Sequence, residues 1–221
     1  MIDIELYIRQ LMGLLEVKFG ARLLYVGLQG SYLREEATES SDIDIMVILD
    51  SLGIDDLAAY RSLIQRMDHF DKSCGFICGR EDLANWNPLE ICFLLNSTKD
   101  YYGTLSSFVP EYSLADVRNF VKMSLNNMYH ELCHRYIHGN LENTMKALPF
   151  VYKSAFYILQ SLHYLRTGEF VGTKAQLLEK LEGCEKDILA RCIAYGEGET
   201  FDFAEAFRLL FSWCQKTLQS V

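Results

Sequence analysis

Two aspartates lie one residue apart in an otherwise apolar segment, "DIDIMVIL" at residues 42–49. Side chains two positions apart on a strand point to the same face, so Asp42 and Asp44 would lie close together. Their mutual repulsion would destabilise the strand unless a cation neutralised it. Magnesium is commonly bound through one or two carboxylates together with substrate phosphates. The pair therefore predicts a site for Mg²⁺ and a phosphate chain.

A Gly-Ser pair upstream of the aspartates supplies groups that suit a phosphate. Gly30 allows the backbone to approach closely, and Ser31 adds a hydroxyl donor. Arg34 can pair with phosphate oxygens in a forked geometry. Ser41 is expected to brace the turn before the aspartates and to line the nucleotide site. An exposed edge strand beside an ordinary turn is the plain alternative, but these residues in this order favour a phosphate-and-metal site.

The segments around these residues show the patterns of strands and of an amphipathic helix. Apolar residues at helical spacing predict a helix over residues 4–19 that ends at Gly20. Short apolar segments predict strands over 22–28 and 42–49. Further along the chain, the same patterns predict a helix over 54–70, a strand over 74–78, a turn or short helix over 80–86 and a strand over 90–95.

After about Pro110 the pattern changes to helices alone. Amphipathic segments predict helices over residues 113–139, 142–168, 173–183, 185–198 and 202–219. We therefore expect an α/β (α+β) catalytic domain with a small mixed sheet over 1–108. An all-α helical bundle that binds the acceptor is expected over 109–221.

Composition narrows the classes of partner. The net charge is −9, whereas a protein that binds DNA or RNA needs a basic face, so no nucleic-acid partner is expected. No segment reaches the length of a membrane-spanning helix and no signal peptide opens the chain, so we expect no membrane partner. The seven cysteines are an odd number and mostly far apart, which favours reduced thiols in the cytoplasm.

The segment "GSYLREEATESSDIDIMVIL" resembles the signature of the polymerase-beta-type nucleotidyltransferase superfamily. The layout of the whole chain is similar to small bacterial aminoglycoside and lincosamide nucleotidyltransferases with a C-terminal helical domain. The resemblance implies that Gly30 and Ser31 hold the triphosphate of ATP or another nucleotide, that Arg34 contacts phosphate, and that Asp42 and Asp44 bind Mg²⁺. Related proteins often have glycine where Glu35 stands.

The superfamily normally uses a third acidic residue on a later strand, and here its identity is less clear. The predicted strand over 74–78 has no acid, and the following segment offers Glu90 and Asp100. We select Glu90 as the third catalytic carboxylate, because it opens a predicted strand and shares a face with Cys92. A surface glutamate at a strand end is the plain alternative.

The helical half offers further candidates. In drug-modifying relatives, a carboxylate of this half can take the proton of the acceptor hydroxyl. The candidates for that carboxylate here are Glu131 and Glu142. Lys153 and Lys174 could reach phosphate, and we select Lys153 for nucleotide binding. The plain alternative for each of these residues is an ordinary surface charge. A histidine stripe with four-residue spacing at His130, His134 and His138 is typical of zinc ligands but more often faces solvent.

These observations predict a magnesium-dependent nucleotidyltransferase. It would transfer a nucleoside monophosphate, AMP from ATP, to a hydroxyl of a small-molecule acceptor such as an aminoglycoside or a lincosamide. The acidic chain suits a cationic acceptor. A protein-directed transferase of the toxin–antitoxin type and a non-catalytic nucleotide-binding relative are the alternatives. The resemblance also implies a homodimer, because related enzymes build their sites near a subunit interface.

Overall fold

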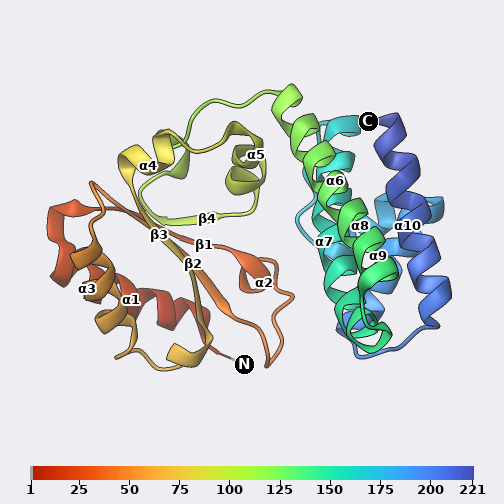
Figure 1. Ribbon diagram of the computed structural model, residues 1–221. Helices are drawn as coiled ribbons and strands as arrows, with labels where there is room; N and C mark the ends of the chain where they lie inside the picture. The colour runs from red at the N-terminus through yellow and green to blue at the C-terminus, as the bar shows by residue number, and fades with distance from the viewer. Residues whose placement is uncertain (1) are drawn as a thin grey trace. The chain divides into compact units, whose positions relative to one another are not determined.

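The computed structural model describes residues 2–221 and divides them into two compact units (Figure 1). The first unit ends at Tyr112 and the second runs from Ser113 to Val221. The first combines a small mixed sheet with helices, and the second is built from helices. This confirms the predicted fold class.

The first unit is organised around a four-stranded sheet in the order β3-β2-β1-β4. Its central strands, β1 (Leu23–Leu28) and β2 (Ile43–Leu49), are antiparallel to each other. Strand β3 (Ser73–Gly79) is parallel to β2, and β4 (Lys99–Tyr102) is antiparallel to β1. The strands predicted over 22–28, 42–49 and 74–78 are therefore confirmed.

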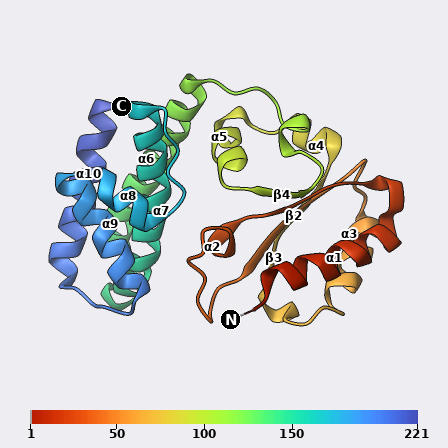
Figure 2. The ribbon, with the colours of Figure 1, turned by 180° about the vertical axis from the view of Figure 1, so that it is seen from behind.

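Two helices cover one face of the sheet, α1 (Ile4–Phe19) and α3 (Ile54–Ile64), and Figure 2 shows them on the same side. The Asp3 side chain caps α1, and Gly20 ends it with a φ of 54°. Helix α3 ends at Ile64, six residues before the predicted end. The core on this face includes Ile8, Leu11, Leu15, Val26, Ile43, Ile45 and Val47.

The opposite face of the sheet carries a smaller core of Tyr25, Met46, Ile48, Cys78, Leu83 and Leu105. Helices α4 (Arg80–Ala84) and α5 (Pro88–Asn96) belong to this side, and a short α2 (Gly30–Leu33) follows β1 (Figure 1). Three 3₁₀ turns complete the unit: η1 (Gly20–Arg22), η2 (Phe70–Lys72) and η3 (Leu105–Ser107).

The strand predicted over residues 90–95 is wrong, because this segment lies inside α5. The Asn87 side chain accepts a hydrogen bond from the backbone N–H of Leu89 at 3.1 Å and so caps the helix. Pro88 occupies the first turn, where its missing N–H has no consequence. A short apolar run cannot be assigned by periodicity alone, and these start signals decide for a helix.

The second unit contains five helices within its described residues. They are α6 (Leu114–His138), α7 (Leu141–Thr167), α8 (Lys174–Lys180), α9 (Gly183–Gly196) and α10 (Phe203–Ser220). All five predicted helical segments are thus confirmed. Ser113 and Asp116 form a capping box at α6, and Asn140 caps α7.

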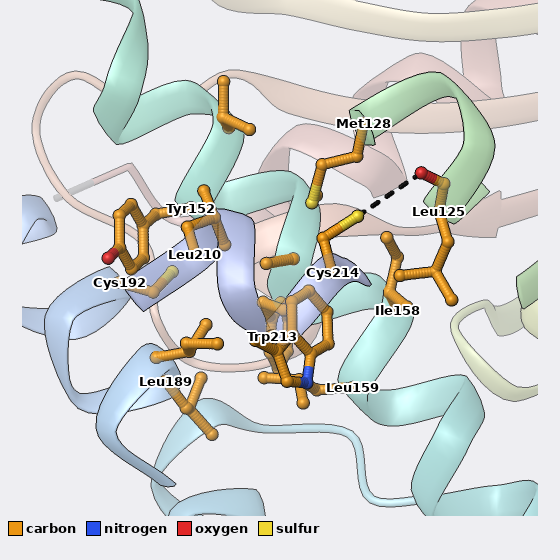
Figure 3. Packing of buried hydrophobic residues seen from close by; sticks show 14 of the residues in the cluster. Leu125, Met128, Tyr152, Ile158, Leu159, Leu189, Cys192, Leu210, Trp213 and Cys214 are labelled. Carbon is orange, nitrogen blue, oxygen red and sulfur yellow. Dashed lines mark hydrogen bonds between the residues drawn. The ribbon is translucent and has the colours of Figure 1, made fainter. Parts of the chain in front are cut away.

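Trp213, Leu159 and Leu189 pack together in the core of the bundle (Figure 3). The Cys214 thiol donates to the carbonyl oxygen of Leu125 at 3.4 Å, which links α10 to α6. Burial raises the pKa of Cys214 to about 12, so this thiol stays protonated. Within residues 2–221, no helix combines the length and the apolar composition needed to cross a bilayer.

Candidate active site

Asp42 and Asp44 lie at the N-terminal end of β2. Asp42 directly precedes the strand and is exposed, whereas Asp44 is its second residue and is half-buried. Alternation along the strand places Asp44 on the face that carries Met46, while Ile43 and Ile45 enter the core beneath α1 and α3. The apolar residues anchor the strand on one side and leave the carboxylates on the other.

The Gly-Ser turn lies directly against Asp44. The backbone N–H of Gln29 donates to the carbonyl oxygen of Asp44 at 2.9 Å, and α2 begins at the next residue. Gly30 has a φ of 71°, in the left-handed region that favours glycine. A Cβ atom at Gly30 would lie 1.9 Å from Oδ2 of Asp44, so only glycine fits. The fold thus joins the two parts of the motif.

Cys74 is a member of this site that the sequence did not single out. It is aligned with Asp44 in the parallel pairing of β2 and β3. Burial, followed by smaller contributions from the Asp44 and Asp42 carboxylates, raises the pKa of its thiol. The thiol therefore stays protonated and serves as a donor beside Asp44. Only the register of the two strands could have revealed this neighbour.

The loop between α2 and β2 is closed by its own polar groups. The Ser41 hydroxyl accepts from the backbone N–H of Thr38 at 2.9 Å, so Ser41 braces the turn before Asp42. Nε of Arg34 lies 3.1 Å from Oε2 of Glu36, and both side chains are mostly buried. Arg34 is therefore held by a carboxylate of the same loop. Contacts of Ser31, Arg34 and Ser41 with a nucleotide remain predictions.

Glu35 adopts a φ of 58°, the backbone region that favours glycine. A glycine, which the family resemblance implies at this position, would adopt this conformation without strain. The loop keeps the glycine-like conformation here although a glutamate occupies it.

Glu90 lies in the first turn of α5 and not on a strand, so the structural basis on which it was selected is wrong. It is nevertheless connected to the face of the sheet that carries Asp44. Phe76 of β3 packs against the core of this face and stacks on Trp86, with ring centroids 5.9 Å apart. The Trp86 indole N–H donates to Oε2 of Glu90 at 2.7 Å. The role of Glu90 as third carboxylate remains a prediction.

Asp100, the other acid of this segment, lies on β4 opposite Gly27. Oδ1 of Asp100 accepts a hydrogen bond from the Tyr25 hydroxyl at 2.6 Å. Burial and this hydrogen bond raise the pKa of Tyr25 far above its ordinary value. Asp100 is therefore engaged in holding β1 and β4 together.

The candidate residues of the helical unit are surface groups. Glu131 pairs with Arg135 at 2.7 Å, and Glu142 pairs with Lys146 at 2.6 Å. Lys153 is exposed on α7. Nζ of Lys174 lies 5.2 Å from the ring centroid of Phe156. Their roles in proton transfer and phosphate binding remain predictions.

The donor set suits magnesium better than zinc. Among residues 2–221, no three His, Cys, Asp or Glu side chains are grouped so that they could hold a metal ion. The rings of His130, His134 and His138 follow one another at 6.1 and 5.3 Å, on exposed side chains. The carboxylates of Asp42 and Asp44 are hard oxygen donors of the kind that Mg²⁺ prefers. Mg²⁺ needs no more from the protein when phosphates complete its shell.

Residues 14–73 match the family model described as a nucleotidyltransferase domain. The match begins within α1, includes Gly30, Asp42 and Asp44, and ends at the first residue of β3. No curated protein matches the chain.

Two solved structures are similar to the chain. Spectinomycin adenyltransferase AAD(9) from Enterococcus faecialis, solved with ATP and spectinomycin, is 13% identical, with a TM-score of 0.62. The similarity covers 97% of this chain and 99% of that chain. A toxin–antitoxin structure with AMP-PNP is 20% identical over 61% of this chain and 94% of that chain, with a TM-score of 0.34. Residues 14–73 thus match a nucleotidyltransferase domain, and the chain shares the fold of an ATP-bound adenyltransferase.

Proposed function

We propose that this protein is a magnesium-dependent adenylyltransferase that acts on a small-molecule acceptor. It would transfer AMP from ATP to an acceptor hydroxyl and release pyrophosphate. The observation that carries the proposal is the close approach of Gly30 to Asp44, because it brings together the turn that we propose for phosphate and the carboxylate that we propose for the metal ion. The family match over residues 14–73 and the spectinomycin-adenyltransferase fold support it.

In this proposal the aspartates bind the metal ion and the Gly-Ser turn binds the phosphates. The carboxylates of Asp42 and Asp44 hold Mg²⁺ at the N-terminal end of β2. The backbone of Gly30 and Ser31 and the Ser31 hydroxyl bind phosphate oxygens and align the chain of phosphates. Mg²⁺ held by these carboxylates would supply positive charge where negative charge develops on the phosphates. Asp42 and Asp44 also fix the place of that charge, because β2 is anchored in the core.

The transfer itself needs a base for the acceptor hydroxyl. The acceptor oxygen attacks the α-phosphorus, the bond from that phosphorus to the bridging oxygen breaks, and pyrophosphate leaves with the electron pair. We assign the released proton to Glu90. Trp86 holds Oε2 of Glu90, so Oε1 is the oxygen that accepts the proton.

A cationic acceptor fits the surroundings of Glu90 best. The chain has a net charge of −9, and Trp86 presents an exposed aromatic side chain beside the Glu90 carboxylate. Aromatic faces and carboxylates both attract cations. Aminoglycosides carry amino groups next to free hydroxyls, and lincosamides carry a basic amine. Both classes are therefore the first acceptors to test.

The proposal is tested by pyrophosphate release from ATP and Mg²⁺ in the presence of aminoglycosides, lincosamides and simple polyols. We expect release that depends on one acceptor class and is abolished in Asp44→Asn. Asp56→Asn is the matched control, because it changes a carboxylate in the first turn of α3 that is paired with Arg22. Full activity of Asp44→Asn would exclude the mechanism.

The remaining outcomes separate the two alternative functions. ATP binding that requires Mg²⁺, without release for any small acceptor, would contradict a small-molecule transferase. A labelled nucleotide found on a co-purified protein would then identify a protein-directed enzyme. Its absence would identify a nucleotide-binding relative without catalysis, and Glu90 would be the first residue to question.

A further inference from the structure

The helical unit contains a hollow of about 580 Å³ that the proposed transfer reaction does not use. It is formed by the end of α6, the beginning of α7 and the first half of α10. Its volume lies within the range of small-molecule binding pockets. The walls are made by Arg135, Tyr136, Gly139, Leu141, Thr144, Phe203, Ala204, Phe207, Arg208 and Phe211.

Aromatic rings form a connected wall of this pocket. Phe207 lies at its centre, 5.0 Å from Tyr136, 5.6 Å from Phe203 and 6.2 Å from Phe211 between ring centroids. The rings of Phe207 and Phe211 are nearly parallel, with an angle of 14° between them. Tyr136 remains 67% exposed, although it packs on this wall. Such a wall offers stacking surface to a planar ring.

Both charged residues that line the pocket are cationic. Two guanidinium groups, Arg135 and Arg208, contribute to the lining, and no carboxylate does. Nε of Arg135 is bound to Glu131, which leaves its two terminal nitrogens for another acceptor. Arg208 is exposed and makes no hydrogen bond or ion pair within the part of the chain that is described. In a protein of net charge −9, this is a local cationic site.

We propose that this pocket binds a small aromatic anion. The planar ring would stack on the wall around Phe207, and the acidic group would accept hydrogen bonds from Arg208 and Arg135. Nucleoside monophosphates and aromatic carboxylates share this chemistry. Every residue of the pocket belongs to the helical unit, and none has a role in the transfer reaction as proposed, so the inference does not rest on that reaction.

The test is calorimetric titration of the full chain carrying Asp44→Asn. Mg²⁺ is left out, so that binding at the proposed nucleotide site of the first unit does not contribute to the measured heat. The probes are AMP and 2-naphthoate. We expect one molecule bound per chain, with the affinity reduced about tenfold or more by Arg208→Gln, because a charge-assisted hydrogen bond is lost. Arg118→Gln removes an exposed arginine of α6 outside the pocket and is the matched control.

Each result supports or overturns the proposal. Tighter binding of AMP identifies a nucleotide as the source of the anion, and tighter binding of 2-naphthoate identifies a carboxylate. No binding of either probe at millimolar concentration, or equal binding by Arg208→Gln and Arg118→Gln, would overturn it. So would a dimer in sedimentation that Tyr136→Ser dissociates, because a second copy would then cover the pocket. Unchanged thermal unfolding of Arg208→Gln shows that the variant is folded.

Discussion

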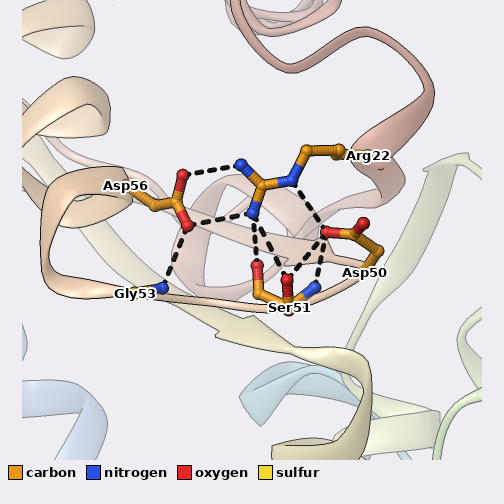
Figure 4. Close-up of polar contacts among 5 residues, drawn as sticks. All are labelled: Arg22, Asp50, Ser51, Gly53 and Asp56. Atoms are coloured by element: carbon orange, nitrogen blue, oxygen red, sulfur yellow. Dashed lines mark hydrogen bonds and ion pairs between the residues drawn. The ribbon is translucent and has the colours of Figure 1, made fainter.

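The two ends of strand β2 carry carboxylates in opposite situations. At the C-terminal end, Arg22 binds Asp50 through Nε at 2.9 Å and Asp56 through both terminal nitrogens at 2.8 and 2.9 Å (Figure 4). It also donates to the carbonyl oxygen of Ser51 at 2.9 Å. These charges are satisfied within the chain, and they attach the loop after β2 to the turn before β1.

At the N-terminal end, the corresponding carboxylates face a turn that is suited to a ligand. Asp42 is exposed, and its side chain makes no hydrogen bond or ion pair among residues 2–221. Asp44 is half-buried between Gly30 and Cys74.

The comparison contrasts acids that are paired within the chain with the acids that we propose as metal ligands. Carboxylates paired with a guanidinium at one end of a strand stabilise the fold, whereas clustered carboxylates retain repulsion that a ligand can relieve. Mutations at the two ends should therefore have opposite effects on stability and on catalysis.

The largest effect is expected for Asp42→Asn and Asp44→Asn. Each removes a ligand for the ion that neutralises the phosphates, so the rate of the proposed transfer should fall about a hundredfold or more. The thermal unfolding temperature should stay the same or rise, because repulsion between the two carboxylates is lost. Turnover by pyrophosphate release and unfolding by circular dichroism check both parts. A large fall in stability would show that these acids are structural.

Gly30→Ala should be the next most damaging change. The added methyl group would displace the Asp44 carboxylate and force a positive φ on alanine, costing about 1–3 kcal/mol of unfolding free energy and most of the activity. Urea unfolding and turnover measure the two losses.

Gly13→Ala is the control for this substitution. Gly13 is an exposed position inside α1 with nothing within 4 Å of an added Cβ, so alanine should stabilise the helix by up to about 1 kcal/mol. Equal behaviour of the two glycine variants would contradict the close contact at Gly30.

Asp56→Asn should show the reverse of the Asp44 result. It removes the negative charge and one of the two oxygens that together accept from Arg22 and from the backbone N–H of Gly53. We expect a modest fall in unfolding temperature with turnover unchanged. Asp55→Asn, a neighbouring exposed acid of α3, should have the smaller effect in the same thermal measurement. A loss of turnover in Asp56→Asn would contradict the assignment of Asp56 to stability alone.

The smallest effect concerns acid stability. Hydrogen bonds from Arg22 lower the pKa of Asp56 to about 2 from an ordinary value of 3.8. The contribution of Asp56 to the free energy of unfolding is therefore fully present above its pKa in the unfolded chain. It is lost as the pH falls from about 4 to about 2. Asp56→Asn should lose less stability than the parent chain over this interval in acid titrations followed by circular dichroism. Parallel curves for the two proteins would exclude Arg22 and Asp56 as a stabilising pair.

Much of the fold follows from local patterns. The helical spacing before Gly20 predicted α1, and apolar segments bounded by turns predicted β1, β2 and β3. The five helices of the second unit were predictable because long amphipathic segments with caps such as Ser113 and Asn140 need little tertiary context. The segment over 90–95 was misassigned because its apolar residues fit either structure, although Asn87 and Pro88 contained the signal for a helix.

The sequence by itself determined the motif of the site: Gly30, Ser31, Asp42 and Asp44 in an order that suits phosphate and magnesium, because residue types and alternation along a strand are local properties. Only the tertiary structure decided which residues surround that motif. Strand register placed Cys74 beside Asp44, and the packing of Phe76 on Trp86 connected Glu90 to the same face. These are contacts between distant segments, and they depend on how the whole core packs.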